Sequence, residues 1–246
     1  MCIRDRHNVG NGAGVKTGLR AATGDVVLVI DCDGQHNPDD IPRLLEHMHR
    51  YDMVIATRTA RDSHENTRRW LGNSMLNRFG SYLADQPMQD LTSGFRAMRR
   101  EVMLEFVHLL PNRFSWAMTS AMALAIAGYH IRFEPVIMQR RQGGQSTQKL
   151  MKNGVSFVMI ALRMASLFAP LRVYLNVALG MFILGLLSFL VSFFITDPWR
   201  FRVPNSAVAL FIGTVIVFMF GLLAEQIAAM RMRIPERHDN AREDQP

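Results

Sequence analysis

The chain has 246 residues, a formal net charge of +7, and 49% hydrophobic residues. Its two cysteines, Cys2 and Cys32, are too few for a disulfide framework or a thiolate metal site. The basic residues do not cluster in one block with interleaved aromatic residues, so nucleic acid is not the expected partner. Anionic lipid or a phosphorylated substrate suits this charge better.

The composition changes sharply along the chain. Residues 1–152 are mixed and charged, whereas long apolar runs dominate from residue 155 onward, and no acidic residue occurs between Glu134 and Asp197. We therefore expect a soluble α/β domain over residues 1–150 and an amphipathic interfacial helix over 151–170. A two-helix transmembrane region over 171–233 and a disordered tail over 234–246 complete the predicted organisation.

Strand and helix patterns alternate in the first part of the chain. A turn-rich stretch at 8–14 precedes a predicted helix over 15–22, and the apolar run at 26–30 predicts a buried strand. Asn37 and Pro38 predict the start of a helix over about 41–49, and a second strand over 53–56 ends near Arg58. This order predicts a mostly parallel α/β sheet.

Three helices and a strand are expected in the rest of the soluble part. The helical patterns cover about 69–83, 99–109 and 114–128, and residues 131–138 have the pattern of a strand. A glycine-containing loop over 140–146 follows, with a tight turn expected earlier at Ser93 and Gly94. Residues 153–168 have one polar and one apolar side, which indicates a helix in the membrane interface; a core helix of the soluble domain is the alternative.

The last part of the chain predicts two membrane spans. Residues 173–195 carry no charge, and at ~1.5 Å per residue they can cross a hydrocarbon core of ~30 Å. Residues 207–230 form the second candidate, with Glu225 near its end. Basic residues flank the outer ends of the pair, so the positive-inside rule places the soluble domain and both termini in the cytoplasm, on a membrane such as the bacterial inner membrane. The sequence is compatible with a homo-oligomer but does not define one.

Two carboxylates follow the predicted strand at 26–30. Ligands of open α/β sheets bind beyond the carboxyl ends of the strands, where Asp31 and Asp33 are expected to lie. Carboxylate oxygens, with Gln35 as a further ligand, suit a hard divalent ion such as Mg²⁺ or Mn²⁺ that bridges to a diphosphate. The alternative for an isolated Asp-x-Asp pattern is a turn or a helix cap.

Seven short motifs occur in one order, and together they carry a family resemblance. They are Asn8-x-Gly-x-Gly-x-Gly14, Ala22-Thr-Gly-Asp25, Asp31-Cys-Asp-Gly-Gln-His-Asn-Pro38, Ala56-Thr-Arg58, Asp90-Leu-Thr-Ser-Gly-Phe-Arg96, Gly128-Tyr-His-Ile131 and Arg141-Gln-Gly-Gly-Gln-Ser146. Over residues 8–150 the chain resembles the dolichol-phosphate mannosyltransferase and polyprenyl-phosphate glycosyltransferase branch of the family-2 glycosyltransferases. The resemblance implies a GT-A fold and an inverting transfer of a hexose. The implied donor is a nucleotide-sugar of the GDP-mannose or UDP-glucose type, and the implied acceptor is polyprenyl or dolichyl phosphate.

The resemblance also implies roles for individual residues. The metal and the donor diphosphate would be held by Asp31, Asp33, Gln35, Gly12 and Arg141. The acceptor phosphate would be held by Arg58, Arg69 and either Asn73 or Ser74, beside Asp90 as a general base or an orienting carboxylate. A solvated or lipid-facing surface is the alternative for the arginines, and a turn cap is the alternative for Asp90.

The chain departs from the family pattern in two places. Residues 113–120 carry no carboxylate where many members have one. This favours a phosphate acceptor, because a phosphate monoester has a second pKa near ~6 and needs no strong base. The family's first strands are not recognisable before Asn8, so we expect an N-terminally truncated transferase domain. A processive polysaccharide synthase, suggested by Asn66-Thr-Arg-Arg-Trp70, and a non-catalytic membrane adaptor are the alternatives.

Overall fold

The computed structural model describes residues 9–32, 34–58, 67–112, 115–138, 154–195 and 203–232. The chain divides into two compact units, residues 1–162 and residues 163–246. The first unit holds most of the shorter elements. They are α1 (Asn11–Ala21), β1 (Val26–Val29), the 3₁₀ turns η1 (Pro38–Asp40) and η2 (His47–His49), α2 (Ile41–Glu46), β2 (Met53–Arg58), α3 (Thr67–Ala84), β3 (Arg96–Arg99), α4 (Arg100–Phe106), α5 (Trp116–Ile126) and β4 (Ile131–Val136). Helix α6 (Gly154–Phe168) runs across the division, and the second unit holds α7 (Pro170–Ile195) and α8 (Asn205–Arg231).

The four strands form one mixed sheet in the order β1-β3-β2-β4. Strand β3 is antiparallel to both β1 and β2, whereas β2 and β4 are parallel. Strands β1, β2 and β4 therefore run in the same direction. The prediction of a mostly parallel sheet holds for these three strands and needs correction for β3, because the reversed strand makes two of the three neighbouring pairs antiparallel.

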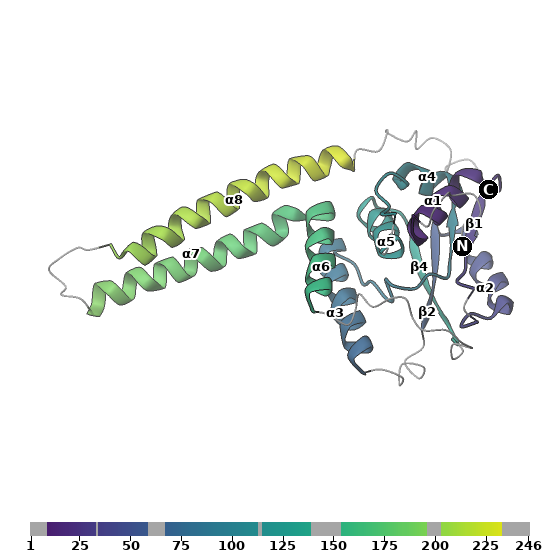
Figure 1. Ribbon diagram of the computed structural model, residues 1–246, viewed down its shortest axis with the longest axis horizontal. Coiled ribbons are helices and arrows are strands. Elements are labelled where there is room, and N and C mark those ends of the chain that lie inside the picture. Colours follow the sequence, from purple (N-terminus) through teal and green to yellow (C-terminus); the bar gives the residue numbers. More distant parts are fainter. Residues whose placement is uncertain are drawn as a thin grey trace. The chain divides into compact units, whose positions relative to one another are not determined.

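Helices cover both faces of this sheet. Leu44 and Met48, from α2 and η2, pack with Val54, Ala56 and Val136 in a buried cluster on one face. Side chains alternate along a strand, so the buried neighbours of these β2 residues point to the other face. Figure 1 shows α2 on one side of the sheet and α5 on the other. Both faces of β2 are thus covered, whereas β1 at the edge of the sheet is exposed or half-buried.

Local sequence explains several of these elements. The β-branched run of β1 suits an extended strand, and the Asn37 side chain accepts a hydrogen bond from the Asp39 amide at 3.2 Å, with Pro38 next to it. This confirms the predicted helix start. Helix α1 begins at Asn11, earlier than predicted, because its glycines are accommodated within the first turn rather than in a loop. Strand β3 was not predicted, since its four residues include Arg96 and Arg99 and have no apolar alternation.

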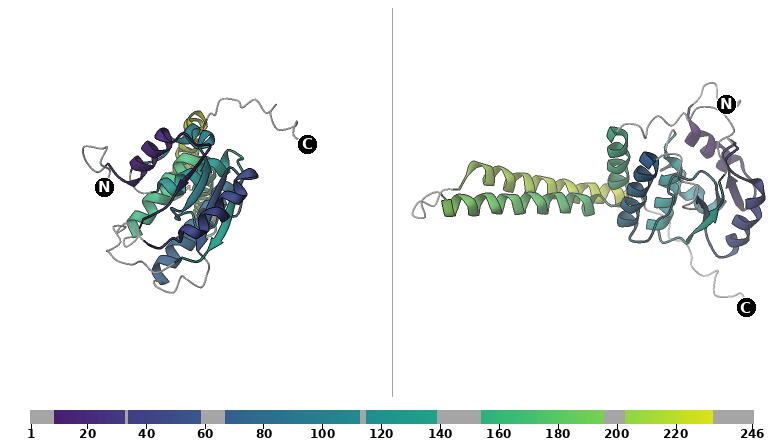
Figure 2. Two further views of the ribbon diagram at one scale, coloured as in Figure 1. Left: turned by 90° about the vertical axis from the view of Figure 1, so that its right-hand side faces the viewer. Right: turned by 90° about the horizontal axis from the view of Figure 1, so that it is seen from below.

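The second unit contains a helical hairpin. Helices α7 and α8 are long and apolar enough to cross a membrane, in agreement with the two predicted spans. They run side by side as an antiparallel pair in Figures 1 and 2. The domain limits drawn from the sequence, including the interfacial helix and the tail, stay predictions.

Close contacts at small residues set the register of this hairpin. A Cβ atom on Gly221 would lie 2.7 Å from Cβ of Tyr174, and one on Gly185 would lie 3.0 Å from Cε1 of Phe211. Nearer the connecting loop, the hydroxyls of Ser188 and Ser206 are 2.8 Å apart and share a hydrogen bond. Small residues allow helices in a membrane to approach closely, where packing and polar contacts replace the hydrophobic effect.

A carboxylate from α8 caps the beginning of α7. Oε2 of Glu225 accepts a hydrogen bond from the backbone amide of Leu171 at 3.1 Å, and α7 has no acidic residue in its own first turn. The first amides of a helix lack partners within the helix, and a negative charge there also complements the helix dipole. Glu225 is the ionisable residue near the end of the second predicted span. Its carboxylate thus satisfies the backbone amide of Leu171 at the start of α7.

We expect a Glu225→Ala variant to destabilise the hairpin by about 1–2 kcal/mol, because Leu171 loses its side-chain acceptor. The melting temperature of the detergent-solubilised protein measures this loss. Glu225→Gln keeps an acceptor oxygen and is expected to recover part of it. Gln226→Ala is the control, since Gln226 is the exposed neighbour on the same helix. Equal melting temperatures for Glu225→Ala and Gln226→Ala would contradict the capping role.

Candidate active site

Three of the predicted site residues, Asp31, Arg58 and Asp90, lie at one edge of the sheet. Because β1, β2 and β4 run in the same direction, their carboxyl ends meet at this edge, where Asp31 follows β1 and Arg58 ends β2. Strand β3 runs the other way, so the loop that precedes it, residues 90–95, lies at the same edge. Three segments that are distant in sequence therefore meet there.

Asp90 closes a turn and holds Arg58. Its Oδ2 accepts a hydrogen bond from the backbone amide of Arg58 at 3.3 Å and lies 3.5 Å from Nε of the same arginine. Its Oδ1 accepts from the Thr92 hydroxyl at 3.0 Å, and its carbonyl accepts from the Ser93 amide at 3.1 Å. Asp90 has a φ of 37°, which aspartate tolerates better than most residues. The carboxylate therefore fixes the loop and aims the Arg58 guanidinium, which is 38% exposed.

The Asp31 carboxylate lies directly against Gly94. A Cβ atom added to Gly94 would lie 2.5 Å from Oδ2 and 3.0 Å from Cγ of Asp31. Only a glycine leaves room for the carboxylate in this position, so Gly94 acts as its seat. The loop after Asp31 is also tied to this region, because the His36 ring packs on Phe95 at a centroid distance of 5.0 Å. The position of Asp31 thus depends on the loop that Asp90 closes.

Helix α3 places Asn73 and Ser74 differently. Oδ1 of Asn77 accepts a hydrogen bond from the Leu91 amide at 3.1 Å, so this side of α3 faces the Asp90 loop. Asn73 lies one turn earlier on the same side, and its Oδ1 is buried without a hydrogen-bond partner in the described part of the chain. Ser74 is exposed. Asn73 thus lies on the side of α3 that faces the Asp90 loop, and the choice between Asn73 and Ser74 stays a prediction.

The structure leaves several predicted residues untested. Asp33 and Arg141 lie outside the described residues, and Arg69 lies in α3 without a described side chain. Gln35 is half-buried in the loop after β1. Gly12 is buried in the first turn of α1, where the adjacent Ala13 amide donates to the carbonyl of Asn112 at 2.8 Å. Their roles stay predictions.

Sequence reasoning assigned no role to Arg96, although it lies in the quoted motif that begins at Asp90. Arg96 is 0% exposed at the start of β3. Burial lowers the pKa of its guanidinium to about 9, and attraction to Asp90 and Asp31 opposes this shift. No pattern of apolar alternation marks β3, whose four residues include Arg96 and Arg99, so the sequence offered no signal that Arg96 is buried.

The residues present fit a hard divalent ion. The described residues contain no group of three or more His, Cys, Asp and Glu side chains that could hold a metal by themselves. Mg²⁺ binds through one or two carboxylates together with substrate phosphates, so such a group is not required. Asp31 is exposed at the edge of the sheet, and the absence of a side chain at Gly94 leaves its carboxylate room there.

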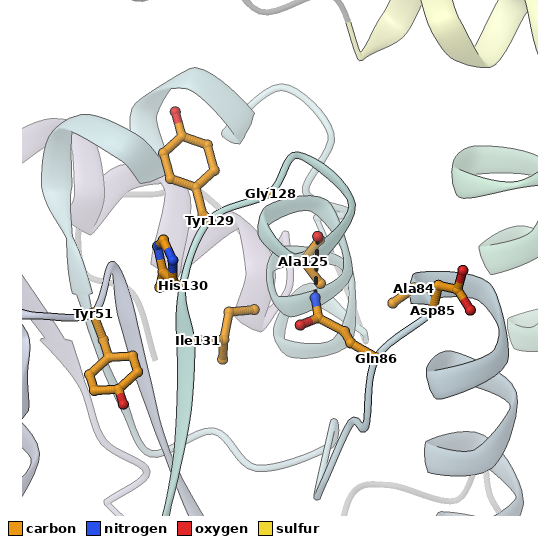
Figure 3. Close-up of a pocket in the computed structure, with 9 residues that line it drawn as sticks. All are labelled: Tyr51, Ala84, Asp85, Gln86, Ala125, Gly128, Tyr129, His130 and Ile131. Carbon is orange, nitrogen blue, oxygen red and sulfur yellow. Dashed lines mark hydrogen bonds between the residues drawn. The ribbon is translucent and has the colours of Figure 1, made fainter. Parts of the chain in front are cut away.

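A pocket with a volume of about 430 Å³ lies elsewhere in the first unit. Figure 3 shows Tyr51, Gln86, Tyr129 and His130 around it, with Gln86 donating a hydrogen bond to the Ala125 carbonyl at 3.2 Å. Tyr51 and His130 precede β2 and β4, so this pocket lies at the amino ends of those strands. It therefore lies at the end of the strands opposite to Arg58.

Comparisons with known proteins agree with the sequence resemblance. Residues 2–106 match the model of glycosyl transferase family 2, and residues 169–230 match that of the GtrB C-terminal hairpin. Two relatives are undecaprenyl-phosphate 4-deoxy-4-formamido-L-arabinose transferases. The protein from Pectobacterium carotovorum is 28% identical over 89% of this chain and 67% of its own length, and that from Pseudomonas aeruginosa is 28% identical over 91% and 66%.

The chain thus spans about two thirds of the length of these two relatives. Among solved structures, glucosyl-3-phosphoglycerate synthase from Mycobacterium tuberculosis has a TM-score of 0.41 at 19% identity, over 65% of this chain and 56% of that one. A likeness this distant carries no functional weight. The first match covers strands β1, β2 and β3 of the mixed sheet, and the second covers the apolar hairpin. The chain therefore carries a region that matches glycosyltransferase family 2, over residues 2–106, and a C-terminal region that matches the GtrB hairpin, over residues 169–230.

Proposed function

We propose that this protein transfers a sugar from a nucleotide-sugar to a polyprenyl phosphate at the cytosolic face of a membrane, with inversion at the sugar carbon. The observation that carries the proposal is the meeting of Asp31, Asp90 and Arg58 at the carboxyl edge of the sheet, in a chain with two apolar spans. Relatives named for transfer involving undecaprenyl phosphate support the lipid acceptor.

On the acceptor side, Arg58 offers a guanidinium whose Nε lies 3.5 Å from Oδ2 of Asp90. A guanidinium can bind a phosphate through two parallel hydrogen bonds, and the exposed part of Arg58 is available for this contact. Asn73 lies on the site-facing side of α3, and Arg69 belongs to the turn before it. These residues would hold the lipid phosphate so that one oxygen faces the donor sugar.

On the donor side, Asp31, Asp33 and Gln35 would hold a divalent ion, and Gly12 and Arg141 would contact the diphosphate. When bound, Mg²⁺ or Mn²⁺ supplies positive charge that stabilises the departing nucleoside diphosphate. The protein's own residues then orient the two reactants and keep water from the sugar carbon, which is the larger part of catalysis for such a transfer.

Asp90 is better suited to orienting than to removing a proton. Both of its carboxylate oxygens accept hydrogen bonds, from Thr92 and from Arg58. A phosphate monoester is mostly a dianion at neutral pH, because its second pKa is near ~6, so the attacking oxygen carries no proton that must be removed. The absence of a carboxylate in residues 113–120 fits the same acceptor.

Membranes that contain the full-length gene product, mixed with radiolabelled nucleotide-sugars and undecaprenyl phosphate, provide the test. We expect one sugar on the lipid, dependent on Mn²⁺ or Mg²⁺. The donors to compare are GDP-mannose, UDP-glucose and a nucleotide-linked 4-deoxy-4-formamido-L-arabinose, because the relatives' names specify the last sugar. An organic-soluble product resolved by thin-layer chromatography identifies the lipid-linked sugar.

An Arg58→Gln variant is expected to raise KM for the lipid phosphate by about tenfold or more, because a charge-assisted hydrogen bond is lost. Arg50→Gln is the matched control, since Arg50 is exposed and precedes the other end of β2. A polymeric product would favour the processive synthase, and transfer only to a sugar hydroxyl would refute the proposal. Failure to bind any nucleotide-sugar in the presence of metal would favour the adaptor.

A further inference from the structure

Arg96 lies beneath the acidic site and connects three segments of the first unit. It stands opposite Ile55 in the ladder between β3 and β2, so its side chain points to the face that α5 covers. Its Nη1 donates to the carbonyl of Ala117 at 2.6 Å and to the hydroxyl of Ser120 at 3.0 Å, and its Nη2 donates to the carbonyl of Ser93. The guanidinium carbon also lies 5.2 Å from the centre of the Trp116 ring.

This buried charge has no carboxylate in ion-pair contact within the described residues. Its hydrogen-bond acceptors are two carbonyls, a hydroxyl and, at 3.9 Å, the Met53 sulfur, all of them neutral. Burying a charge without a paired opposite charge is costly, and an apolar side chain of similar volume would avoid that cost. The carboxylates that attract Arg96 are Asp90 and Asp31, both in the candidate site. A buried charge without a paired opposite charge departs from the usual packing of a protein interior. Such a departure next to a candidate site indicates a functional role.

The contact with Ser93 couples Arg96 to Asp31. Ser93 precedes Gly94, and Gly94 provides the seat on which the Asp31 carboxylate lies. Arg96 holds the Ser93 carbonyl from the buried side, while the Ser93 amide is held by Asp90 on the other side. Ser93, the residue before Gly94, is thus held through both its backbone amide and its backbone carbonyl.

The positive charges of Arg58 and Arg96 also lie on two sides of the acidic loop. Arg58 approaches Asp90 from the exposed side of the loop, and Arg96 attracts Asp90 and Asp31 from the buried side. Two carboxylates that lie close together repel each other, and a fixed cation beneath them offsets this repulsion. Such an arrangement keeps the acidic groups in place before a metal and a diphosphate arrive, which is the preorganisation that electrostatic catalysis requires.

We propose that Arg96 is a positioning residue of the transferase: it fixes the Ser93–Gly94 peptide and supplies the buried positive charge that holds Asp31 and Asp90 in the donor-binding geometry. This role rests on the proposed function, since it concerns the same site. It does not require Arg96 to touch either substrate, which its complete burial prevents.

The test compares Arg96→Lys and Arg96→Met with the wild-type full-length protein. Arg96→Lys keeps the charge but cannot reach all of the acceptors, whereas Arg96→Met also removes the charge. We expect kcat per folded protein to fall about tenfold in Arg96→Lys and further in Arg96→Met. Mn²⁺ binding, measured by electron paramagnetic resonance without substrates, is expected to weaken several-fold in Arg96→Lys, because Asp31 loses its fixed support.

Arg99→Met is the matched control, from the other end of the same strand. Arg99 contacts Asp52 and the Met48 carbonyl, away from the acidic loop, so its loss is expected to lower stability without changing kcat. If Arg96→Met does not fold, Ser120→Ala serves in its place, since it removes one acceptor and keeps the charge. Ser120→Ala is then expected to lower kcat a few-fold per folded protein.

The outcomes separate the two proposals. A wild-type protein that binds Mn²⁺ but transfers no sugar to undecaprenyl phosphate contradicts the proposed function alone. An active wild-type protein whose Arg96→Lys variant keeps both kcat and Mn²⁺ affinity within twofold overturns the positioning role. In that case Arg96 serves only the stability of the fold, and its variants differ from wild type in melting temperature alone.

Discussion

An Asp31→Asn variant is expected to lose about 10²–10³-fold of its metal-dependent transfer activity. Asparagine has the same shape but no charge, so the site loses one of its hard anionic ligands. The expected loss corresponds to several kcal/mol of activation free energy, since about 1.4 kcal/mol changes the rate tenfold. The Asp31 residue is exposed, so we expect the melting temperature to change little. The same loss is expected for Asp33→Asn, with membrane insertion intact in both variants.

The control for this experiment is Asp39→Asn. Asp39 is exposed in the 3₁₀ turn after the same loop, so it tests the effect of removing a nearby surface charge. Initial rates over a range of Mn²⁺ concentrations provide the measurement, and a higher concentration for half-maximal activity is expected in Asp31→Asn alone. Full activity of Asp31→Asn at limiting Mn²⁺ would rule out a metal at the end of β1.

The second large effect is expected from Gly94→Ala, which should lower kcat by about tenfold to a hundredfold. The added methyl group would lie 2.5 Å from Oδ2 of Asp31, so the carboxylate must move by a few tenths of an ångström or more. Displacements of about 1 Å in an active site can reduce the rate about a hundredfold. Gly94 is not among the described glycines with positive φ, so alanine introduces no backbone strain there. The fold should therefore persist while the site is displaced.

Gly18→Ala is the matched control, because nothing lies within 4 Å of the added Cβ and the residue lies inside α1. Alanine at such a helical position is expected to stabilise the protein by about 0.5–1 kcal/mol and to leave kcat unchanged. Melting temperature and kcat, measured on both variants, separate a displaced carboxylate from a general loss of stability. Equal kcat for Gly94→Ala and wild type would show that Asp31 does not depend on this seat.

The Gly94→Ala variant and the Arg96→Lys variant affect the same contact. Gly94→Ala pushes Asp31 from its seat, whereas Arg96→Lys loosens the peptide that forms the seat. Because both changes act on the same contact, their effects on kcat are not expected to add. The double variant should be little worse than the more damaging single variant. This double-mutant cycle measures the coupling between the buried arginine and the acidic edge.

Much of the site could be predicted from local patterns. The apolar run before Asp31 predicts a strand, which the structure confirms as β1, although its residues are exposed or half-buried rather than buried. The second predicted strand, β2, ends at Arg58 and runs in the same direction as β1, but β3 lies between the two. Ligands of such sheets bind beyond the carboxyl ends of the strands, so a site at Asp31 was expected, whereas Arg58 was assigned to the acceptor only through the family resemblance. The spans of the hairpin were equally accessible, because more than twenty uncharged residues in a row have few other stable environments.

The sequence did not reveal contacts that depend on a reversed strand. Strand β3 is short and contains two arginines, so no alternation of apolar residues marks it. Its antiparallel insertion brings residues 90–95 to the edge that carries Asp31. Because β3 was not predicted, the sequence left Asp90 equally compatible with a general base and with a turn cap. The Asp31–Gly94 contact and the role of Arg96 could not be predicted either.

By itself, the sequence determined an α/β domain followed by an apolar hairpin, and it predicted a metal site at the strand end that carries Asp31. The tertiary structure decided how that edge is built: Asp90 holds Arg58, Gly94 supports Asp31, and Arg96 holds the loop from beneath. The reason is that periodicity and turn residues report on neighbours along the chain. The placement of a buried charge against distant carboxylates depends instead on packing between segments that no local pattern records.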